Sequence, residues 1–589
     1  MPSIFRRSRV GLAGLAAMLL VPPALITFAA PNAVAENNGL ALTPLLGWSS
    51  WSFIRTNPTE AKIEAQADAL KSSGLAGYGF DRINLDDFYY ICDSGTGPAV
   101  DGNGYWAIDP AKFPDSDGVD GIAATAAHVH ADGLKFGLYV TPGIAKAAVA
   151  ANTPIQGTSD TAAGIAEPSV GENNYNCGGM VGIDYTKPGA QAFINGWADQ
   201  MAGEGVDYVK LDGVGSFDIP DVQAWSAALR QTGRPMALEL SNSLSISDAT
   251  TWESLANGWR TTGDIECYGC ESNGSSYPET DYANVASRFD PAAAWQPYGQ
   301  PGAWNDYDSI EVGNGDNDGL TVPQRQTQLS LWAMADSPLI LGTDLTHLDS
   351  GDLALLKNSA MLGIDQDTIP AARVVDSGNE QVFSKRETNG AFDIAVFNTD
   401  ANAAHSESVS LPALGLSGAA TVTDLWAGTS LGTINGTYTA TVPAGGVSLI
   451  SATPASGAGG TGELLGAQSG KCLDTNGGEV YLPGTAEQLW DCHNGIGQEF
   501  TLTSGGQLRT EGATECLDVY DQETAPGTKV ELWPCNGQAN QQWTINSNGT
   551  VTSAQSGLCL DADNQGTTDG TPVIIWTCNG QANQQWSRD

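Results

Sequence analysis

From Leu45 to about Ile364 the chain repeats one pattern: a short apolar run that ends in turn-forming residues, followed by an amphipathic stretch. Within residues 60–73, for example, Ile63, Ala67 and Leu70 fall on one helical stripe. Eight strand-then-helix units over roughly 300 residues predict a (β/α)8 TIM barrel. The eight expected strands are 45–51, 83–88, 134–140, 206–212, 236–240, 259–264, 302–306 and 338–341.

Charged and aromatic residues gather within and at the ends of these apolar runs. A barrel brings the C-terminal ends of its strands together at one mouth, where active sites of this architecture lie. Residues two apart in a strand share a face, so Lys210 and Asp212 are expected to point into the same mouth. The group comprises Trp51, Asp86, Asp87, Lys210, Asp212, Glu239, Arg260 and Asp264.

Two carboxyl groups that face each other across a sugar ring are the minimum apparatus for cleaving a glycosidic bond. Asp212 and Asp264 are the candidates, and the ammonium of Lys210 favours the ionised form that a nucleophilic carboxylate needs. Taken singly, Lys210 and Asp212 are explained as a structural ion pair, and Asp264 as a helix cap. Their accumulation at one end of five strands favours a retaining glycoside hydrolase.

Residues 463–589 contain an internal three-fold repeat, which predicts a β-trefoil. Each unit carries Cys-Leu-Asp, then a tryptophan two residues before a second cysteine, then Gln-x-aromatic. An indole can stack on a sugar face while a carboxylate accepts hydroxyl protons, so we expect three sugar pockets, with Phe500, Trp543 and Trp586 as core. The expected binding residues are Asp474, Trp490, Asp518, Trp533, Asn540, Gln541, Asp561, Trp576, Asn583 and Gln584. The first unit has Gly497 in place of the asparagine, which predicts the weakest pocket of the three.

Between the barrel (38–368) and the trefoil, the pattern changes to short alternating strands. These predict an antiparallel β-sandwich over 369–452, in which no chemistry is visible. A Gly/Ala/Ser-rich linker is expected at 453–462. The expected strands are 373–376, 381–385, 392–397, 406–411, 420–425, 437–442 and 447–450.

The N-terminus indicates export. Three arginines, an apolar run and a small-residue cleavage signal make residues 1–35 a signal peptide; nothing later forms another apolar span that would favour a membrane anchor. The formal net charge of −42 argues against nucleic-acid or anionic-lipid partners and suits a secreted, extracellular protein acting on a neutral substrate. We expect no membrane association.

Ten cysteines in an exported chain predict disulfides. Cys267-Tyr-Gly-Cys270 has metal-like spacing, but no second Cys or His pair accompanies it, so a local bridge is expected instead of a zinc site. Cys92 and Cys177 would then pair across two loops. We expect neither a metal nor a cofactor. Six further cysteines belong to the trefoil repeat, one pair to each unit: Cys472, Cys492, Cys516, Cys535, Cys559 and Cys578.

These motifs, in this order, resemble glycoside hydrolase family 27, the α-galactosidase and α-N-acetylgalactosaminidase group, over residues 40–450. The tail resembles the ricin-type trefoil of carbohydrate-binding module family 13. The matching segments in the family 27 region are Thr43-Pro-Leu-Leu-Gly-Trp-Ser-Ser-Trp51, Asn84-Leu-Asp-Asp87, Gly133-Leu-Lys-Phe-Gly-Leu-Tyr139, Asp207-Tyr-Val-Lys-Leu-Asp212, Trp259-Arg-Thr-Thr-Gly-Asp264 and Trp304-Asn-Asp-Tyr-Asp308.

The resemblance implies Asp212 as nucleophile and Asp264 as general acid/base. It implies that Asp86 and Asp87 bind O4 and O6 of galactose, Lys210 the O3/O4 side and Arg260 O2, with Trp51 as a pocket wall. Glu239 and Asp308 complete the expected substrate-binding set.

Two departures fall on the O2 side and the outer lip of the implied pocket. Val140-Thr-Pro-Gly143 replaces the family's Ser-Asp-Ala-Gly, and Leu238-Glu-Leu240 replaces its Cys-Glu-Trp. An α-galactosidase is therefore expected first, with β-L-arabinopyranosidase or isomalto-dextranase as alternatives within the family. The short Asp87 leaves space for a hydroxymethyl group and favours a hexose. The alternative outside enzymes is a carbohydrate-binding lectin with an inactive barrel. The expected partners of the protein are a galactoside or related oligo- or polysaccharide as substrate and a polysaccharide bound by the trefoil.

Overall fold

The computed structural model describes residues 38–93, 97–115, 118–270, 279–313, 315–387, 391–414, 416, 419–454, 461–478, 480–493, 495–503, 505–510, 515–546 and 548–588. The expected signal peptide, residues 1–35, lies outside them. So does most of the expected linker, of which only the flanking residues are described. Residues 453 and 454 end a strand of the sandwich, and Thr461–Gly462 form strand β22.

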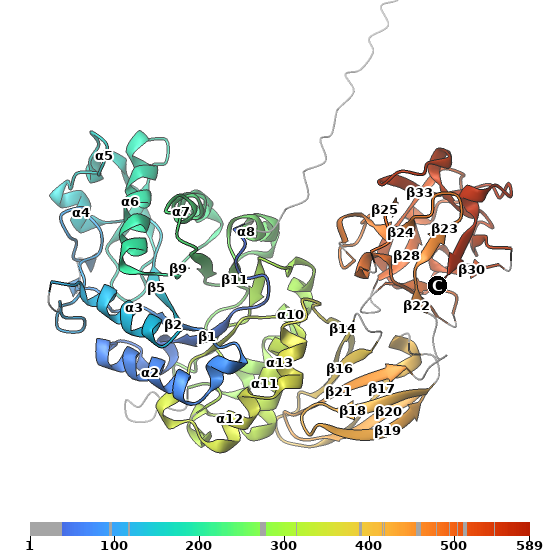
Figure 1. Ribbon diagram of the computed structural model, residues 1–589, viewed down its shortest axis with the longest axis horizontal. Coiled ribbons are helices and arrows are strands. Elements are labelled where there is room, and N and C mark those ends of the chain that lie inside the picture. The colour runs from blue at the N-terminus through green and yellow to red at the C-terminus, as the bar shows by residue number, and fades with distance from the viewer. Residues whose placement is uncertain are drawn as a thin grey trace, which may run out of the picture. The chain divides into compact units, whose positions relative to one another are not determined.

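All eight expected barrel strands form one parallel sheet in the order β12-β11-β10-β9-β5-β2-β1-β13 (Figure 1). The sheet closes where Ile310 N donates to Ile340 O (2.8 Å) and Gly342 N donates to Ile310 O (3.0 Å). The strands are β1 (Leu46–Ser49), β2 (Arg82–Leu85), β5 (Lys135–Val140), β9 (Tyr208–Asp212), β10 (Ala237–Ser241), β11 (Gly258–Arg260), β12 (Trp304–Asp306) and β13 (Leu339–Leu341).

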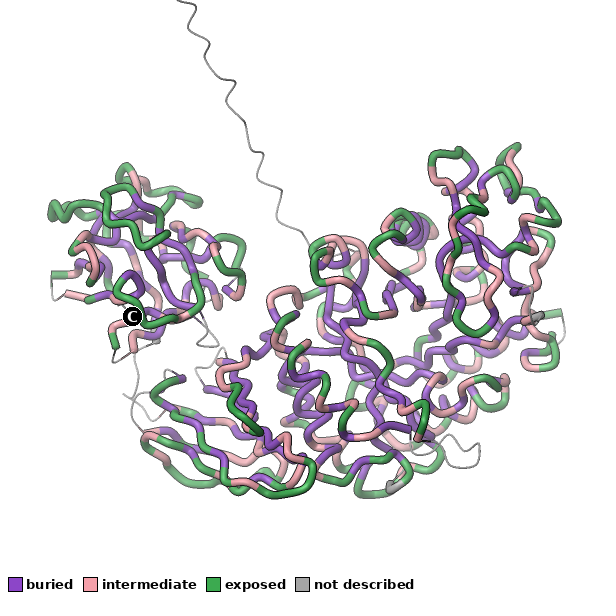
Figure 2. Tube along the Cα trace, turned by 180° about the vertical axis from the view of Figure 1, so that it is seen from behind, coloured by how far each residue is buried: buried purple, intermediate pink, exposed green. Residues whose placement is uncertain are grey.

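Helices surround this sheet because its strands are apolar on both faces and have to be covered outside as well as filled inside. Figure 2 shows buried backbone running through the barrel and exposed backbone at its loops. The longer helices are α2 (Glu60–Ser72), α3 (Gly121–Ala131), α6 (Pro188–Glu204), α7 (Ile219–Gln231) and α11 (Val322–Met334). Among the fully buried side chains are Trp48, Trp225, Trp259 and Trp332.

The long polar stretch after β5 is ordered as a small subdomain. Strands β6 (Ile144–Ala145), β7 (Ala166–Glu172) and β8 (Met180–Ile183) form an antiparallel sheet beside helices α4 (Lys146–Ala151) and α5 (Ala162–Ile165). A disulfide joins Cys177 of this subdomain to Cys92, as the sequence suggested.

The next domain is the expected antiparallel sandwich, with a six-stranded sheet (β14-β15-β16-β21-β18-β19) and a two-stranded one (β17-β20). Strand β19 was not expected, because most of its residues are exposed and show no alternation of apolar and polar side chains. The strands are β14 (Ala372–Ser377), β15 (Glu380–Arg386), β16 (Phe392–Asn398), β17 (His405–Ser410), β18 (Ala419–Asp424), β19 (Thr429–Asn435), β20 (Thr437–Val442) and β21 (Val447–Pro454).

One buried lysine ties the sandwich to the barrel region. Lys385 of β15 is fully buried, and its ammonium donates to Asp336 Oδ1 (3.1 Å), Asp367 Oδ1 (2.7 Å) and Ile364 O (2.6 Å). A buried charge is tolerated only with such a complete set of partners, so this contact fixes the sandwich against the helices around Ile364.

The C-terminal domain is a β-trefoil in which β23 (Leu464–Gly466), near its start, pairs with the last strand, β34 (Trp586–Arg588). Phe500, Trp543 and Trp586 are buried in its core, as expected. The repeat cysteines pair within each unit, Cys472–Cys492, Cys516–Cys535 and Cys559–Cys578. The remaining strands are β24 (Cys472–Thr475), β25 (Glu487–Trp490), β26 (Phe500–Leu502), β27 (Leu508–Arg509), β28 (Glu515–Val519), β29 (Thr528–Pro534), β30 (Trp543–Ile545), β31 (Val551–Ser553), β32 (Cys559–Ala562) and β33 (Thr571–Trp576).

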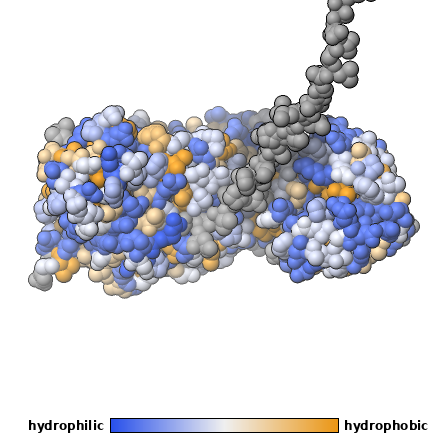
Figure 3. Space-filling view, turned by 90° about the horizontal axis from the view of Figure 1, so that it is seen from above, coloured by the Kyte–Doolittle hydropathy of each residue, from blue (hydrophilic) through white to orange (hydrophobic). Residues whose placement is uncertain are grey.

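Hydrophilic residues dominate the face shown in Figure 3, with hydrophobic ones scattered among them. Within the described part of the chain, none of the helices has the length and apolar character needed to span a membrane.

Candidate active site

A pocket of about 300 Å³ opens at the C-terminal mouth of the barrel. It brings together six residues expected from the sequence, including both candidate catalytic carboxylates. They come from the ends of β2 and β9 and from the loops that follow β1 and β11, which explains why residues so far apart in the chain converge. The lining residues are Trp51, Asp86, Asp87, Tyr139, Tyr175, Asn176, Lys210, Asp212, Asp264 and Tyr268.

Asp212 ends β9 with its carboxylate facing the pocket, and Tyr139 Oη donates to its Oδ2 at 3.1 Å. Burial and the adjacent carboxylate raise the pKa of Tyr139 well above its usual value, so this phenol remains a hydrogen-bond donor. Gly213 follows with φ +82°, and a Cβ there would lie 3.0 Å from Asn173 Cβ. Glycine therefore allows both the turn after Asp212 and the close approach of the subdomain.

Lys210 and Asp86 form an ion pair on the floor of the pocket, with Nζ 2.8 Å from Oδ2. Burial opposes the charge on Lys210, but the carboxylates of Asp86 and Asp212 outweigh it and raise the pKa of the ammonium. The lysine therefore stays charged beside both acids, as the strand periodicity predicts.

Asp87 lies beside them and is almost fully buried. Burial raises its pKa to about 6, opposed by hydrogen bonds that include one from Asn176 Nδ2 at 2.8 Å. Phe88, with φ 72°, turns the chain away and stacks on Trp51 at 6.4 Å between ring centroids. Trp51 does not end the first strand as expected; it begins helix α1 (Trp51–Ile54) and still forms a wall of the pocket.

Asp264 lies four residues beyond the end of β11, on a loop, and not in the strand as expected. Its Oδ1 accepts from Arg260 Nη2 (3.1 Å) and its Oδ2 from Tyr268 Oη (2.6 Å). Burial would raise the pKa of Asp264, but Arg260 and the Tyr268 hydrogen bond outweigh it and lower the pKa below its usual value.

Three expected substrate-binding residues lie deeper than expected. Glu239, Arg260 and Asp308 line a smaller cavity inside the barrel, below the pocket, and Asp86 and Lys210 border both spaces. Glu239 pairs with Lys210 on the neighbouring strand, but its side chain is shorter and stays against Gly258. Arg260 is the last residue of β11, and Asp308 holds its guanidinium within the barrel.

Arg260 and Asp308 nevertheless shape the site. Arg260 Nη2 lies 2.8 Å from Asp308 Oδ2, and the same oxygen accepts from Ile265 N at 2.7 Å. The pair therefore holds the loop that carries Asp264. Glu239 is buried against Gly258, and burial raises its pKa well above the usual range.

Sequence reasoning missed Tyr139, Tyr175, Asn176 and Tyr268. Tyr175 and Asn176 come from the subdomain after β5, next to Cys177, so the disulfide to Cys92 secures the pocket wall that they form. Tyr268 lies between Cys267 and Cys270, which are bridged to each other as expected. The sequence did offer one signal for Tyr268. It is an aromatic residue inside a four-residue disulfide loop, four positions after the candidate acid Asp264.

The described residues also include an acidic group beside the pocket wall. Oxygen atoms of Glu172, Asp218 and Asp221 lie within 4.8 Å of one another, a spacing that suits shared protons or a cation. Burial, with Asp218 and Asp221 nearby, raises the pKa of Glu172 to about 9. A proton held by Glu172 therefore satisfies this group at neutral pH.

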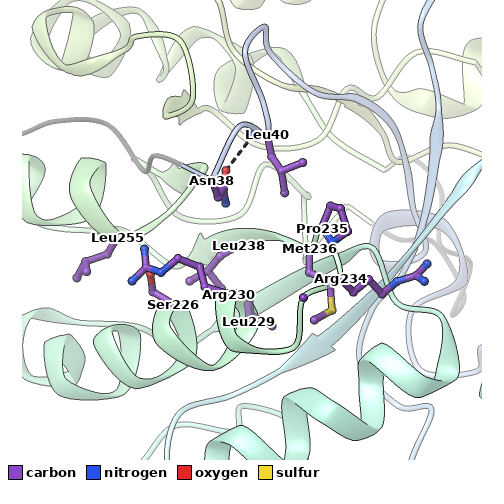
Figure 4. A pocket seen from close by; sticks show the side chains of 11 residues that line it. Asn38, Leu40, Ser226, Leu229, Arg230, Arg234, Pro235, Met236, Leu238 and Leu255 are labelled. Atoms are coloured by element: carbon purple, nitrogen blue, oxygen red, sulfur yellow. Dashed lines mark hydrogen bonds between the residues drawn. The ribbon is translucent and has the colours of Figure 1, made fainter.

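A different cavity, of about 250 Å³, lies at the opposite end of the barrel, where Met236 precedes β10 (Figure 4). Its lining is largely apolar, and Arg234 there donates to Val206 O and Gly205 O. It contains no pair of carboxylates and lies at the end of the barrel that stabilises the fold.

The trefoil units present similar aromatic groups. Trp490, Trp533 and Trp576 are 41%, 44% and 42% exposed, and each strand pairing places the tryptophan across from the cysteine two residues before the repeat aspartate. Around Trp533 there is a cavity of about 350 Å³ that is lined also by Asp518 and Asn540.

Gln541 and Gln584 were expected to bind sugar, but they are fully buried and hold the aspartates instead. Gln541 Nε2 donates to Asp518 Oδ2 (2.9 Å) and Gln584 Nε2 to Asp561 Oδ2 (2.7 Å). Asn583 is also buried and donates to Ala562 O at 3.2 Å.

The first unit differs in a way that the sequence did not reveal. His493 Nε2 lies 3.3 Å from Asp474 Oδ2, on the carboxylate that a sugar hydroxyl would need. The equivalent positions of the other units are Asn536 and Asn579. A side chain of the protein itself therefore competes for the first pocket.

Comparison with known proteins agrees with this architecture. Residues 173–367 match the family model of α-galactosidase A, 377–452 that of the α-galactosidase C-terminal β-sandwich domain, and 460–586 that of the ricin-type β-trefoil lectin domain. The chain is 31% identical to α-galactosidase A of Cellvibrio japonicus, over 61% of this chain and 76% of that protein. It is 30% identical to a probable α-galactosidase of Dictyostelium discoideum, over 74% of this chain and 99% of that protein.

Among solved structures, a GH27 β-L-arabinopyranosidase from Geobacillus stearothermophilus superimposes with a TM-score of 0.66 at 26% identity, covering 72% of this chain and 99% of that one. Three observations indicate the same family: the barrel with two carboxylates at its mouth, the sandwich that follows it, and these relatives. The chain belongs to the α-galactosidase family of glycoside hydrolases, GH27, and carries a ricin-type trefoil at its C-terminal end.

Proposed function

We propose that this protein is an exported, retaining α-galactosidase that releases terminal α-D-galactose. The observation that carries the proposal is the shared pocket: Asp212 and Asp264 line one cavity together with Lys210. Its volume of about 300 Å³ suits a single pyranose ring with part of its leaving group.

The polar floor of the pocket supports galactose as the sugar. Asp86 and Asp87 are adjacent carboxylates, and Lys210 adds an ammonium beside Asp86, so hydroxyl donors and acceptors are both satisfied. A glucose-configured ring would direct O4 equatorially, away from Asp86. Asp87 is short enough to leave room for the hydroxymethyl group that an arabinopyranoside lacks, and the two relatives compared above are named as α-galactosidases.

In the first step Asp212 attacks C1 while the bond from C1 to the glycosidic oxygen breaks, and Asp264 gives its proton to that oxygen. A galactosyl ester on Asp212 results. In the second step Asp264, now a carboxylate, takes a proton from water, and the water oxygen attacks C1 and releases Asp212. Two inversions leave the anomeric configuration unchanged.

Three aryl or polymeric substrates test the sugar: p-nitrophenyl α-galactoside, p-nitrophenyl β-L-arabinopyranoside and dextran. We expect fastest release from the galactoside, with α-galactose as the first product by NMR. Faster cleavage of the arabinopyranoside or of dextran would replace the assignment with the corresponding activity. Asp212→Asn should abolish release, and unchanged release by this variant would refute Asp212 as the nucleophile. No release by the parent protein from any of the three substrates would favour the lectin alternative.

The trefoil is proposed to hold the exported enzyme on a galactan- or xylan-like polysaccharide, since its exposed tryptophans lie beside buried aspartates in repeat pockets. Removal of residues 463–589 should preserve turnover of small glycosides and reduce retention on insoluble polysaccharide. Equal retention by the shortened chain would contradict this role. Export through residues 1–35 predicts that the mature protein begins near Glu36, which N-terminal sequencing of secreted protein checks.

A further inference from the structure

The short disulfide loop after Asp264 places a phenol on the candidate acid/base. Tyr268 lies between the bridged Cys267 and Cys270, and its Oη donates to Asp264 Oδ2 at 2.6 Å. Tyr268 also accepts a hydrogen bond, because Trp51 Nε1 donates to the same Oη at 2.7 Å. Three pocket residues therefore form one chain of hydrogen bonds.

The direction of this chain follows from its first member. An indole N–H can only donate, so Tyr268 Oη is the acceptor toward Trp51. Its single hydrogen is then directed to Asp264, which accepts it as a carboxylate. The arrangement stabilises the ionised form of Asp264, and Arg260 on the other oxygen acts in the same direction.

This arrangement is the reverse of what the first chemical step needs. A general acid has to present a proton to the glycosidic oxygen, yet both oxygens of Asp264 are occupied by donors. Arg260 is buried beneath the pocket, whereas Tyr268 is 51% exposed at its mouth. Only Tyr268 is therefore placed where an incoming leaving group could take its position.

We propose that Tyr268 is a displaceable positioning residue, which holds Asp264 as a carboxylate in the empty pocket and gives up Oδ2 to the leaving-group oxygen when substrate binds. This inference rests on the proposed role of Asp264. As Tyr268 withdraws, Oδ2 takes up one proton from solvent and then passes it to the glycosidic oxygen when the bond to C1 breaks. The phenol keeps its own proton throughout.

The surroundings of Tyr268 suit a side chain that moves. Arg55 makes a cation–π contact with its ring, at 5.3 Å from the guanidinium carbon to the ring centroid. A Cβ added at the neighbouring Gly269 would meet no atom within 4 Å, so the tip of the loop faces open space. The bridge fixes both ends of the loop, which limits the movement to its tip.

Other charged groups around Asp264 stay in place during this exchange. The cations that act on it are those of Arg260 on β11, Lys210 on β9 and Arg288 before helix α10 (Phe289–Trp295). The acids are Glu266 and Asp308, whose oxygens lie within 4.8 Å of Asp264, and Asp212 across the pocket. Tyr175 is the other phenol on which Asp264 acts.

The test is the pH dependence of kcat/KM for Tyr268→Phe, with an α-galactoside that has a poor leaving group, such as melibiose. Loss of a hydrogen bond to the ionised carboxylate raises the pKa of Asp264. Because the acid has to be protonated, the fall in activity at high pH should move upward by about one pH unit. With p-nitrophenyl α-galactoside, whose leaving group needs little protonation, the effect should be smaller.

An unshifted alkaline limb in Tyr268→Phe, even with lower kcat, would overturn the proposal and leave Tyr268 a structural residue. Tyr78→Phe is the matched control, since Tyr78 is 42% exposed and packs against Lys357, and its profile should equal that of the parent. The double variant Cys267→Ser/Cys270→Ser should shift the limb in the same direction as Tyr268→Phe, and no shift would count against the loop.

Asp264→Asn separates this inference from the proposed function. If Asp264 is the acid/base, that variant loses the alkaline limb, and added azide restores turnover of the p-nitrophenyl substrate. If Asp264→Asn keeps the parent profile, the proposed function fails. If Asp264→Asn behaves as expected and Tyr268→Phe keeps the parent profile, only the role of Tyr268 fails.

Discussion

The ammonium of Lys210 lies 2.8 Å from Oδ2 of Asp86, and the same cation acts on Asp212 two residues along its own strand. One side chain therefore acts on the proposed sugar-binding carboxylate and on the proposed nucleophile together. Asp86 is 3% exposed, so without that cation its charge would be left in a buried setting.

Lys210→Ala should consequently lower kcat/KM by about 10²-fold or more, because a preorganised positive charge beside the reacting groups is lost. Steady-state kinetics with p-nitrophenyl α-galactoside measures this. Lys187→Ala is the control, since Lys187 is an exposed residue that pairs with Asp184 at 3.5 Å on the surface, and its loss should leave kcat/KM unchanged. Near-parent activity in Lys210→Ala would show that the floor of the pocket does not bind the sugar.

A second prediction concerns the choice between hexose and pentose. Asp87→Glu adds one methylene to a buried side chain that is held by Asn176, so its carboxylate advances into the space proposed for the hydroxymethyl group. The ratio of kcat/KM for galactoside over β-L-arabinopyranoside should fall by roughly 10- to 200-fold. An unchanged ratio in this variant would place the C5 substituent elsewhere in the pocket.

The acidic group at Glu172 makes stability depend on pH. Its folded pKa of about 9 lies above the ordinary value of 4.5, so between these values the folded state keeps a proton that the unfolded state has released. This contribution to stability is therefore full below about pH 4.5 and is lost as the pH rises toward 9. The protein should unfold at a higher temperature at pH 5 than at pH 8.

Glu172→Gln removes the need for that proton and should raise the unfolding midpoint by a few degrees at pH 8, with little effect at pH 5. Calorimetry at both pH values measures it. Glu167→Gln, in the same strand β7 but exposed, should change neither value. Lower stability of Glu172→Gln at pH 8 would show that the group uses its negative charge, as a bound cation requires.

Sequence periodicity was sufficient for the barrel because each buried parallel strand is a short, mainly apolar run followed by a helical pattern, as at 134–140. The positions of Asp212 and Lys210 followed directly, since Asp212 ends such a strand and Lys210 shares its face two residues earlier. The same reasoning misplaced Glu239, which pairs with Lys210 on the neighbouring strand but has a shorter side chain that stays inside the barrel. Periodicity predicts which face of a strand carries a side chain. How far that side chain reaches toward the mouth of the barrel depends also on its length and on its packing.

Tyr175, Asn176 and Tyr268 escaped prediction for a different reason. They lie on loops that reach the pocket through tertiary contacts, secured by the Cys92–Cys177 and Cys267–Cys270 bridges. Loop position is set by such long-range contacts and leaves little local pattern in the sequence. In the trefoil, the repeat revealed the tryptophans and aspartates, but Gln541 and Gln584 recur equally because they support the aspartates.

Two tryptophans ten residues apart in the second trefoil unit allow binding and folding to be separated. Trp533 is 44% exposed beside Asp518, whereas Trp543 is 2% exposed and its Nε1 donates to Leu517 O at 2.8 Å. Trp533→Ala should weaken retention of the full-length enzyme on insoluble polysaccharide without changing its unfolding midpoint. Trp543→Ala should instead destabilise the trefoil by about 3–5 kcal/mol.

The equivalent change in the first unit, Trp490→Ala, should reduce retention less than Trp533→Ala, because His493 already occupies Asp474 there. His493→Asn copies the second unit and should strengthen retention, since it frees the carboxylate for a sugar hydroxyl. Pull-down on the polysaccharide, with the variants in parallel, measures these differences in retention. An equal loss in Trp490→Ala and Trp533→Ala would mean that a sugar displaces His493 at no cost, and the three pockets would then be equivalent.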